Sequence, residues 1–161
     1  MREWLRVYTY KAGLLSPMAH DLQISLTRWN LQPEGSHWLF QADAAHLEID
    51  GPIVRGQLEQ RGITDKDRRK IKSHIQDTIL KTQSHPKIIF RGRPTNQALE
   101  GELRLKGSIQ SITIPLRNDG PLVRGEVEIQ PSRWGITPFK ALGGAIKLQD
   151  RIRVVFCVNG L

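Results

Sequence analysis

The chain has 161 residues, enough for one domain whose core needs no disulfide or metal to support it. Hydrophobic residues make up 39% of the sequence, which excludes a disordered chain, and the single cysteine, Cys157, excludes an internal disulfide framework. The formal net charge of +8 attracts anionic partners, but charge alone does not define a nucleic-acid-binding protein.

From the sequence we expect neither a secretory signal nor a membrane span. The first twenty residues, MREWLRVYTYKAGLLSPMAH, lack a continuous apolar core. No later stretch reaches the ~18 continuous apolar residues that a membrane-spanning helix needs. We therefore expect a soluble, cytoplasmic protein that forms one domain over residues 1–161.

The first third of the chain reads as alternating strands. EWLRVYTYK and DLQISLTRW both alternate between apolar and polar residues, and Leu22, Ile24 and Leu26 form one apolar row. In HWLFQADAAHLEI the apolar parity changes after Phe40 and the alanines that follow it. This change of parity predicts a β-bulge that switches the buried face of the strand.

One segment, at about 64–83, has helical rather than strand periodicity. Ile71, Ile75 and Ile79 recur at four-residue spacing in ITDKDRRKIKSHIQDTILKT, and Thr64 precedes them as an N-cap. Between residues 61 and 87 there are eight Lys or Arg against three Asp, so the helix together with its flanking residues carries more than half of the net charge. The pattern predicts an amphipathic helix that ends before Pro86 and closes one end of a β-structure.

The C-terminal half returns to strands with one apolar and one charged face. ALEGELRLKG, SITIPLRN and LVRGEVEIQ each alternate, and AIKLQDRIRVVF does so with a QD pair that predicts a tight turn within it. Together with the N-terminal segments this gives about eight antiparallel strands. So many strands require a sandwich or a closed barrel to protect their edges.

Four stretches in chain order resemble the YceI-like family. These are AGLLSPMAHDLQISL, ILKTQSHPKIIFRG, LEGELRLKGSIQSITIPL and VRGEVEIQPSRWGI. The resemblance implies an all-β fold: an eight-stranded antiparallel lipocalin-like barrel with the helix packed near its mouth. It also implies that the barrel binds an apolar isoprenoid chain, such as a polyprenyl or quinone tail, without catalysis.

The inward rows of the strands are the candidates for the wall of such a barrel. Burial of each ligand CH₂ group contributes ~0.8 kcal/mol, so a long apolar tail gains affinity without polar recognition. No cofactor is expected other than this bound lipid. The predicted lining residues are Leu22, Ile24, Leu26, Phe40, Leu103, Leu105, Ile112, Ile114, Val127, Ile129, Val154 and Phe156.

Three further residues are predicted to lie at the mouth: His20, Asp21 and Trp134. His20 and Asp21 also leave open an enzyme that uses a histidine beside a carboxylate, or a metal site that they form with His46 and Asp43. Adjacent strand residues point to opposite faces, however, and the spacing matches no metal-binding motif. The sequence therefore predicts no catalytic residue and no metal site.

The positive charge leaves two kinds of partner to compare. A basic helix over Lys66–Lys81 is suited to an anionic membrane surface. A nucleic-acid-binding barrel is the alternative, but the exposed rows mix Glu with Lys and Arg, which opposes a groove that follows a phosphate backbone. We expect no specific nucleic acid, and exposed strand edges leave a homodimer open.

Overall fold

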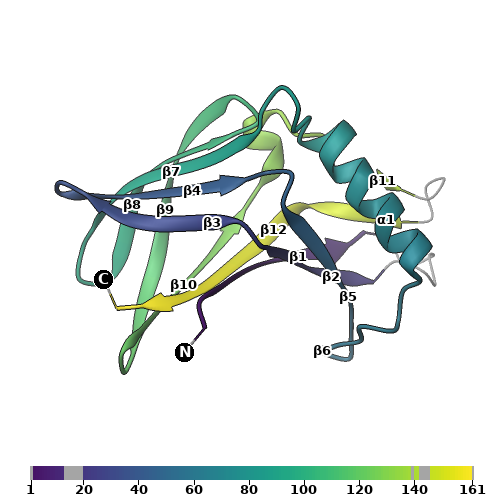
Figure 1. Ribbon diagram of the computed structural model, residues 1–161, viewed down its shortest axis with the longest axis horizontal. Helices are drawn as coiled ribbons and strands as arrows, with labels where there is room; N and C mark the ends of the chain where they lie inside the picture. The colour runs from purple at the N-terminus through teal and green to yellow at the C-terminus, as the bar shows by residue number, and fades with distance from the viewer. Residues whose placement is uncertain (1, 13–19, 139, 142–145, 161) are drawn as a thin grey trace.

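The computed structural model describes residues 2–12, 20–138, 140–141 and 146–160 (Figure 1). Among these residues, eleven strands form one antiparallel path in the order β3-β4-β7-β8-β9-β10-β12-β1-β2-β5-β6, and β11 pairs with β12 beside it. Figure 1 shows this sheet curled into a half-barrel, with helix α1 lying across one end. The expected all-β class with one helix is confirmed.

The elements follow the alternation seen in the sequence. In the first half the strands are β1 (Trp4–Lys11), β2 (Asp21–Leu26), β3 (Trp29–Glu34), β4 (His37–Asp43), β5 (Leu47–Val54) and β6 (Gln57–Leu58). Helix α1 (Asp65–His74) continues as a π-helix, η1 (Ile75–Ile79). The second half contains β7 (Lys87–Pro94), β8 (Ala98–Leu105), β9 (Ser108–Asp119), β10 (Leu122–Ile129), the 3₁₀ helix η2 (Pro131–Trp134), β11 (Lys140–Ala141) and β12 (Ile146–Asn159).

The path has eleven strands rather than the expected eight, mainly because two long strands bend. β2 and β3 are separated only by Thr27 and Arg28, and β4 and β5 only by residues 44–46. Two backbone bonds continue the pairing through the bend: Thr27 N–H donates to the His46 carbonyl and Asp43 N–H to the Arg28 carbonyl, both at 3.0 Å. The predicted bulge is therefore a break in the strand. This bent hairpin carries the chain from β1 on one side of the sheet to β7 on the other.

A two-residue turn joins β8 to β9, and the residue that precedes Pro86 at the start of HPKIIFRG lies against this turn. Lys106 and Gly107 both have positive φ, 50° and 77°, as the turn type that suits a tight hairpin requires. A Cβ atom on Gly107 would lie 2.9 Å from Cε1 of His85. The histidine that precedes Pro86 thus packs on this turn, and the chain enters β7 beside β8.

Helix α1 begins as the sequence predicts but ends earlier. Asp67 N–H donates to Oγ1 of the N-cap Thr64 at 3.1 Å, and Ile71 is 0% exposed. The helical segment stops at Ile79 rather than near residue 83, because Lys81 adopts a left-handed φ of 49°. A lysine is not a typical helix-ending residue, so the sequence carries no clear signal for this stop.

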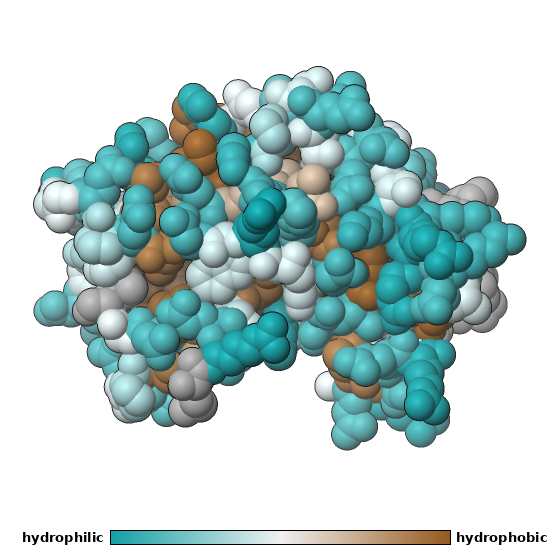
Figure 2. All heavy atoms as spheres, viewed as in Figure 1, coloured by the Kyte–Doolittle hydropathy of each residue, from teal (hydrophilic) through white to brown (hydrophobic). Residues whose placement is uncertain are grey.

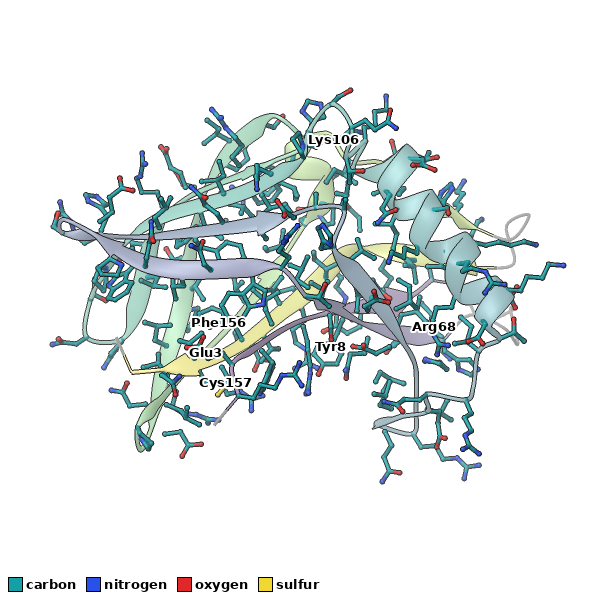
Figure 3. The ribbon with its side chains drawn as sticks, viewed as in Figure 1. Glu3, Tyr8, Arg68, Lys106, Phe156 and Cys157 are labelled. Carbon is teal, nitrogen blue, oxygen red and sulfur yellow. The ribbon has the colours of Figure 1, made fainter. Side chains whose placement is uncertain are left out.

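Part of the positive charge of α1 holds the helix against β5 and the loop that follows β6. Arg68 Nε donates to the Ile49 carbonyl at 2.7 Å, and Nη2 donates to the Gln60 carbonyl at 2.8 Å (Figure 3). Lys72 Nζ lies 3.3 Å from Glu48 Oε1. The basic helix is therefore attached through some cations and exposes others.

β12 is one continuous strand, so the turn predicted at Gln149 and Asp150 is wrong. Thr9 pairs with Ile152 and Lys11 with Leu148, so β12 carries extra residues opposite β1. Gln149 Nε2 donates to the Lys11 carbonyl at 2.8 Å across this irregularity. The polar pair is accommodated as a bulge, which leaves the apolar residues on either side of it facing inward.

Hydrophilic side chains cover most of the face shown in Figure 2, and apolar patches appear between them. No helix among the described residues is long and apolar enough to cross a membrane. The apolar surface of the strands is instead gathered inside the curl of the sheet.

Candidate ligand-binding site

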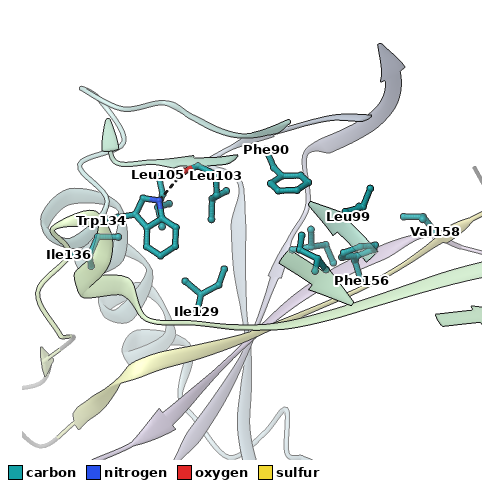
Figure 4. Close-up of a cluster of buried hydrophobic side chains, with 11 residues drawn as sticks. Phe90, Leu99, Leu103, Leu105, Ile129, Trp134, Ile136, Phe156 and Val158 are labelled. Carbon is teal, nitrogen blue, oxygen red and sulfur yellow. Dashed lines mark hydrogen bonds between the residues drawn. The ribbon is translucent and has the colours of Figure 1, made fainter. Parts of the chain in front are cut away.

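The curled sheet encloses an apolar cavity of about 130 Å³, here called the first cavity. Side chains from opposite walls, including Phe90, Leu103, Ile129 and Phe156, point toward a shared interior (Figure 4). All the residues around it are apolar or aromatic. They are Leu5, Val7, Leu26, Trp29, Leu31, Phe40, Ile88, Phe90, Leu99, Leu103, Leu105, Ile112, Ile114, Val127, Ile129, Ile152, Val154, Phe156 and Val158.

A second cavity of about 170 Å³ lies beside the first, at the end covered by the helix. Ile75, Ile79 and Leu80 form part of its wall, so the isoleucine stripe of the helical segment lies where the sequence predicted a barrel end. Five residues line both cavities, which makes the two spaces adjoin. The shared residues are Val7, Leu26, Ile88, Leu105 and Ile152.

The two cavities differ in polarity. No polar or charged side chain other than the indole of Trp29 lines the first cavity, and its ring packs near Phe40 with centroids 6.0 Å apart. The second cavity includes Thr9, Thr137 and Gln149 in its wall, and no charged residue. A charged ligand group would lose its hydration in either space without gaining a partner of opposite charge. The interior therefore suits a slender hydrocarbon chain.

Of the twelve predicted lining residues, all but Leu22 border one of these cavities. Ile24 lines the second cavity, Leu26 and Leu105 line both, and the others line the first. Leu22 is 4% exposed and packs in the cluster beneath α1 instead. The role of these residues in binding a ligand stays a prediction.

The three residues predicted at the mouth occupy different surroundings. Trp134 is 1% exposed, and its indole N–H donates to the Leu103 carbonyl at 2.9 Å inside the core (Figure 4). Asp21 begins β2 and its Oδ1 accepts the Lys11 N–H at 2.8 Å. His20 is half-buried just before β2, and residues 13–19 of the adjoining family-like stretch lie outside the described residues.

Several wall residues were missed by the sequence prediction although a signal existed. Leu5, Val7 and Thr9 form the inward row of EWLRVYTYK, and Phe90 and Ile88 form that of KIIFRG. Both rows were visible as alternation. Pro131, Ile136 and Pro138 also line the second cavity. They lie outside the alternating strand segments, so only the folded chain places them there.

Titratable side chains gather at the bend of the hairpin, away from the cavities. No group of three or more His, Cys, Asp or Glu side chains gathers among the described residues in a way that could hold a metal ion. Asp43 is engaged at the bend, where the hydrogen bond from Lys87 holds its pKa below the ordinary value of 3.8. His46 Nε2 lies 3.2 Å from Nη1 of Arg28 at the same bend. These groups serve the closure of the hairpin and lie outside both cavity walls.

On the outer face of β1 and β12, arginine side chains interact with tyrosine rings and carboxylates of the same chain. The guanidinium carbon of Arg153 lies 4.4 Å from the centre of the Tyr8 ring, and its Nη1 lies 3.1 Å from Glu126 Oε1. Arg151 lies over Tyr10 at 3.9 Å and 3.4 Å from Glu128. Because each of these cations already has a carboxylate beside it, the face is poorly suited to a nucleic-acid backbone.

Comparison with known proteins agrees with this fold. A family model for the YceI-like domain matches residues 20–159. BcnA of Burkholderia cenocepacia is similar in structure, with a TM-score of 0.63 and 11% identity over 99% of this chain and 96% of that chain. A polyisoprenoid-binding domain from Saccharophagus degradans gives a TM-score of 0.60 and 8% identity over 96% and 91%.

The YceI protein of Campylobacter jejuni is also similar, with a TM-score of 0.60 and 12% identity over 93% of this chain and 88% of that chain. A search of curated proteins finds no match to the sequence. At these identities the structural likeness establishes the fold, whereas the family match covers most of the sequence itself. The chain belongs to the YceI-like domain family.

Proposed function

We propose that the protein is a non-catalytic carrier or store for an isoprenoid-type lipid, whose polyprenyl or quinone tail lies in the two cavities. The observation that carries this proposal is that both cavities are apolar and share five wall residues. A rigid compact ligand needs only one of them, while a long branched chain extends through both. The polyisoprenoid-binding domain from Saccharophagus degradans, which has a similar fold, also supports this choice.

The physical basis of binding is burial rather than polar recognition. At ~0.8 kcal/mol for each CH₂ group removed from water, a few isoprene units supply micromolar affinity after the cost of ordering the chain. This mode of binding tolerates variation in tail length and gives little selectivity along the tail.

Native mass spectrometry of the freshly purified protein tests the proposal. We expect a mass increment that solvent extraction removes, and we expect the emptied protein to take up a long polyprenol again. A protein that is purified empty and also rejects long polyprenyl chains contradicts the proposal.

We also propose that the exposed face of α1 brings the protein to anionic membranes. Lys66, Arg69 and Lys70 are exposed, and their side chains have no hydrogen-bond or ion-pair partner among the described residues. Each such cation contributes about 1 kcal/mol near an anionic lipid surface. The same helical segment lines the second cavity, so docking through this face places the cavity wall close to the membrane.

Vesicle sedimentation tests this second proposal. Replacing Lys66, Arg69 and Lys70 together by Gln is expected to weaken binding to phosphatidylglycerol vesicles about a hundredfold at low salt. The matched control removes three exposed charges from β7 and β8, at Arg91, Arg93 and Arg104. Equal losses in the two triple variants attribute the binding to net charge and exclude a docking face on α1.

A further inference from the structure

The wall of the half-barrel has a gap between β9 and β10. The two strands pair only near their shared turn, where residues 116–119 face residues 122–125. Beyond Leu116 and Gly125, the described part of β9 pairs only with β8, and β10 only with β12. Figure 1 shows the two strands diverging from this turn.

A pocket of about 250 Å³ occupies the gap and reaches the wall of the first cavity. Ser111, Thr113, Glu128 and Arg133 form its polar lips. Ile112 and Val127 line this pocket and also the first cavity. At this point the side chains of two residues separate the apolar interior from a polar recess on the surface.

The strand edges on either side of the gap carry hydrogen-bonding groups that have no partner on a neighbouring strand. The hydroxyl-bearing residues Ser111 and Thr113 are exposed, and alternate backbone N–H and C=O groups of an unpaired strand edge face outward. Arg133 Nη2 donates to the Ser111 carbonyl at 3.2 Å, which shows that this backbone edge is turned toward the gap. Gln110 Nε2 donates to the Arg133 carbonyl at 3.0 Å and holds η2 over the same place.

The charges around the gap are mixed and oppose a phosphate. Ser111 pairs with Glu102 and Thr113 with Glu100, so two carboxylates flank the hydroxyls on the adjacent strand. Arg91 and Arg93 of β7 lie opposite these carboxylates on their far side. Glu128 adds a third, although Arg151 lies 3.4 Å from it. A dianionic group placed beside Arg133 meets this carboxylate repulsion, whereas an uncharged group does not.

We propose that the gap between β9 and β10 holds the polar end of the bound lipid, and that this end is an uncharged hydroxyl or carbonyl group rather than a phosphate. The inference rests on the proposed function, because it assumes a tail in the first cavity. The Arg133 guanidinium and the hydroxyls of Ser111 and Thr113 donate to the oxygen of the ligand. A ligand hydroxyl in turn donates to Ser111 or Thr113 oxygen.

Calorimetric titration with three ligands of the same tail tests the site. The ligands are phytanol, phytanyl phosphate and the hydrocarbon phytane, which share one saturated, branched tail. We expect the alcohol to bind at least as tightly as the phosphate and more tightly than the hydrocarbon. The double variant Ser111→Ala/Thr113→Val should weaken binding of the alcohol about tenfold and leave phytane unchanged.

The double variant Ser73→Ala/Thr78→Val is the matched control, because it removes two exposed hydroxyls from the helical segment. It should leave all three affinities unchanged. Equal affinities for alcohol and hydrocarbon, with no effect of the β9 variant, overturn the subsite while the carrier function stands. A phosphate that binds more than tenfold tighter than the alcohol, and loses this advantage in Arg133→Gln, overturns the uncharged head. If none of the three ligands binds, the proposed function itself fails.

Discussion

Two strand glycines determine where phenylalanine rings lie inside the curled sheet. Gly125 pairs with Phe156, and a Cβ atom at Gly125 would lie 2.1 Å from Cζ of the ring. In the same way, a Cβ atom at Gly92 would lie 2.6 Å from Cε1 of Phe90. Both rings lie over strand glycines, and both line the first cavity. The glycines let the rings lie flat against the wall, which leaves space in the middle.

Gly125→Ala tests this packing at the level of a single atom. The added methyl overlaps the Phe156 ring, so we expect the free energy of unfolding to fall by about 1–3 kcal/mol in urea denaturation. In a Phe156→Leu background the same change should cost much less. An equal cost in both backgrounds shows that the ring is not what Gly125 accommodates.

Asp150 provides a pH-dependent anchor for η2. Its carboxylate accepts the Ser132 N–H at 2.9 Å, the Ser132 hydroxyl, and Gln130 Nε2 at 3.1 Å. Partial burial raises the pKa of Asp150, but these hydrogen bonds outweigh it and hold the pKa below the ordinary value of 3.8. The folded protein therefore binds this proton less readily than the unfolded chain does.

Because the pKa of Asp150 is lower in the folded protein than in the unfolded chain, its stabilising effect is present above about pH 4. This effect is lost as the pH falls through the pKa of the folded state. We expect Asp150→Asn to cost about 1 kcal/mol at pH 7. The difference in melting temperature between variant and wild type should shrink as the pH falls below about 4. A difference that stays constant down to pH 2 means that the charge of Asp150 does not hold η2.

At the scale of the element, the helical segment is a cover that Arg68 attaches through several hydrogen bonds, beside the contact of Lys72 with Glu48. Arg68 supplies the carbonyls of Ile49, Asp50 and Gln60 with donors and also contacts Asp65 at 2.9 Å. Arg69, the next residue, is exposed. Two adjacent arginines therefore differ in role: Arg68 attaches the helix, whereas Arg69 faces solvent.

Replacing Arg68 by Ala should destabilise the protein by about 2–3 kcal/mol, because three backbone carbonyls lose a charged donor. Arg69→Ala is the control and should stay within about 0.5 kcal/mol of wild type. Chemical denaturation measures both values. If the two variants are equally stable, Arg68 does not fasten the helix to β5.

The sequence predicted which helix and strands form better than it predicted where they end. The four-residue isoleucine spacing identified the helix and Thr64 its start, because capping and periodicity are local effects. The end at Ile79 depends on a left-handed Lys81, and the break at residues 44–46 depends on closure of the sheet. The left-handed Lys81 has no local signal, whereas the change of apolar parity indicates a disruption near residues 44–46 without showing that the strand breaks there.

At the scale of the whole molecule, the interior contains cavities. The inward side chains of the curled sheet are of moderate size and do not fill the space at its centre. Alternation in the sequence predicted most of the walls, including Ile114 and Val154. It could not show that the space between them stays open, because the same apolar rows pack a filled core equally well. Leu22 shows this ambiguity, since its row is inward but its side chain packs beneath α1.

Ile152→Trp tests the joined cavities, because Ile152 lines both of them. The larger ring is expected to fill the junction and reduce the affinity for a long polyprenol at least tenfold, with little loss in melting temperature. Lys147→Trp, on the exposed side of the same strand, should bind normally. Normal binding by Ile152→Trp contradicts a ligand that passes from one cavity into the other.

The most direct measurement is a crystal structure of the protein saturated with a long-chain polyprenol. We expect continuous, elongated electron density that runs from beside Trp29 in the first cavity, past Ile152, to Ile75 and Ile79 in the second. Cavities that hold only separate water molecules, or that are filled by shifted side chains while the polyprenol is excluded, contradict the account.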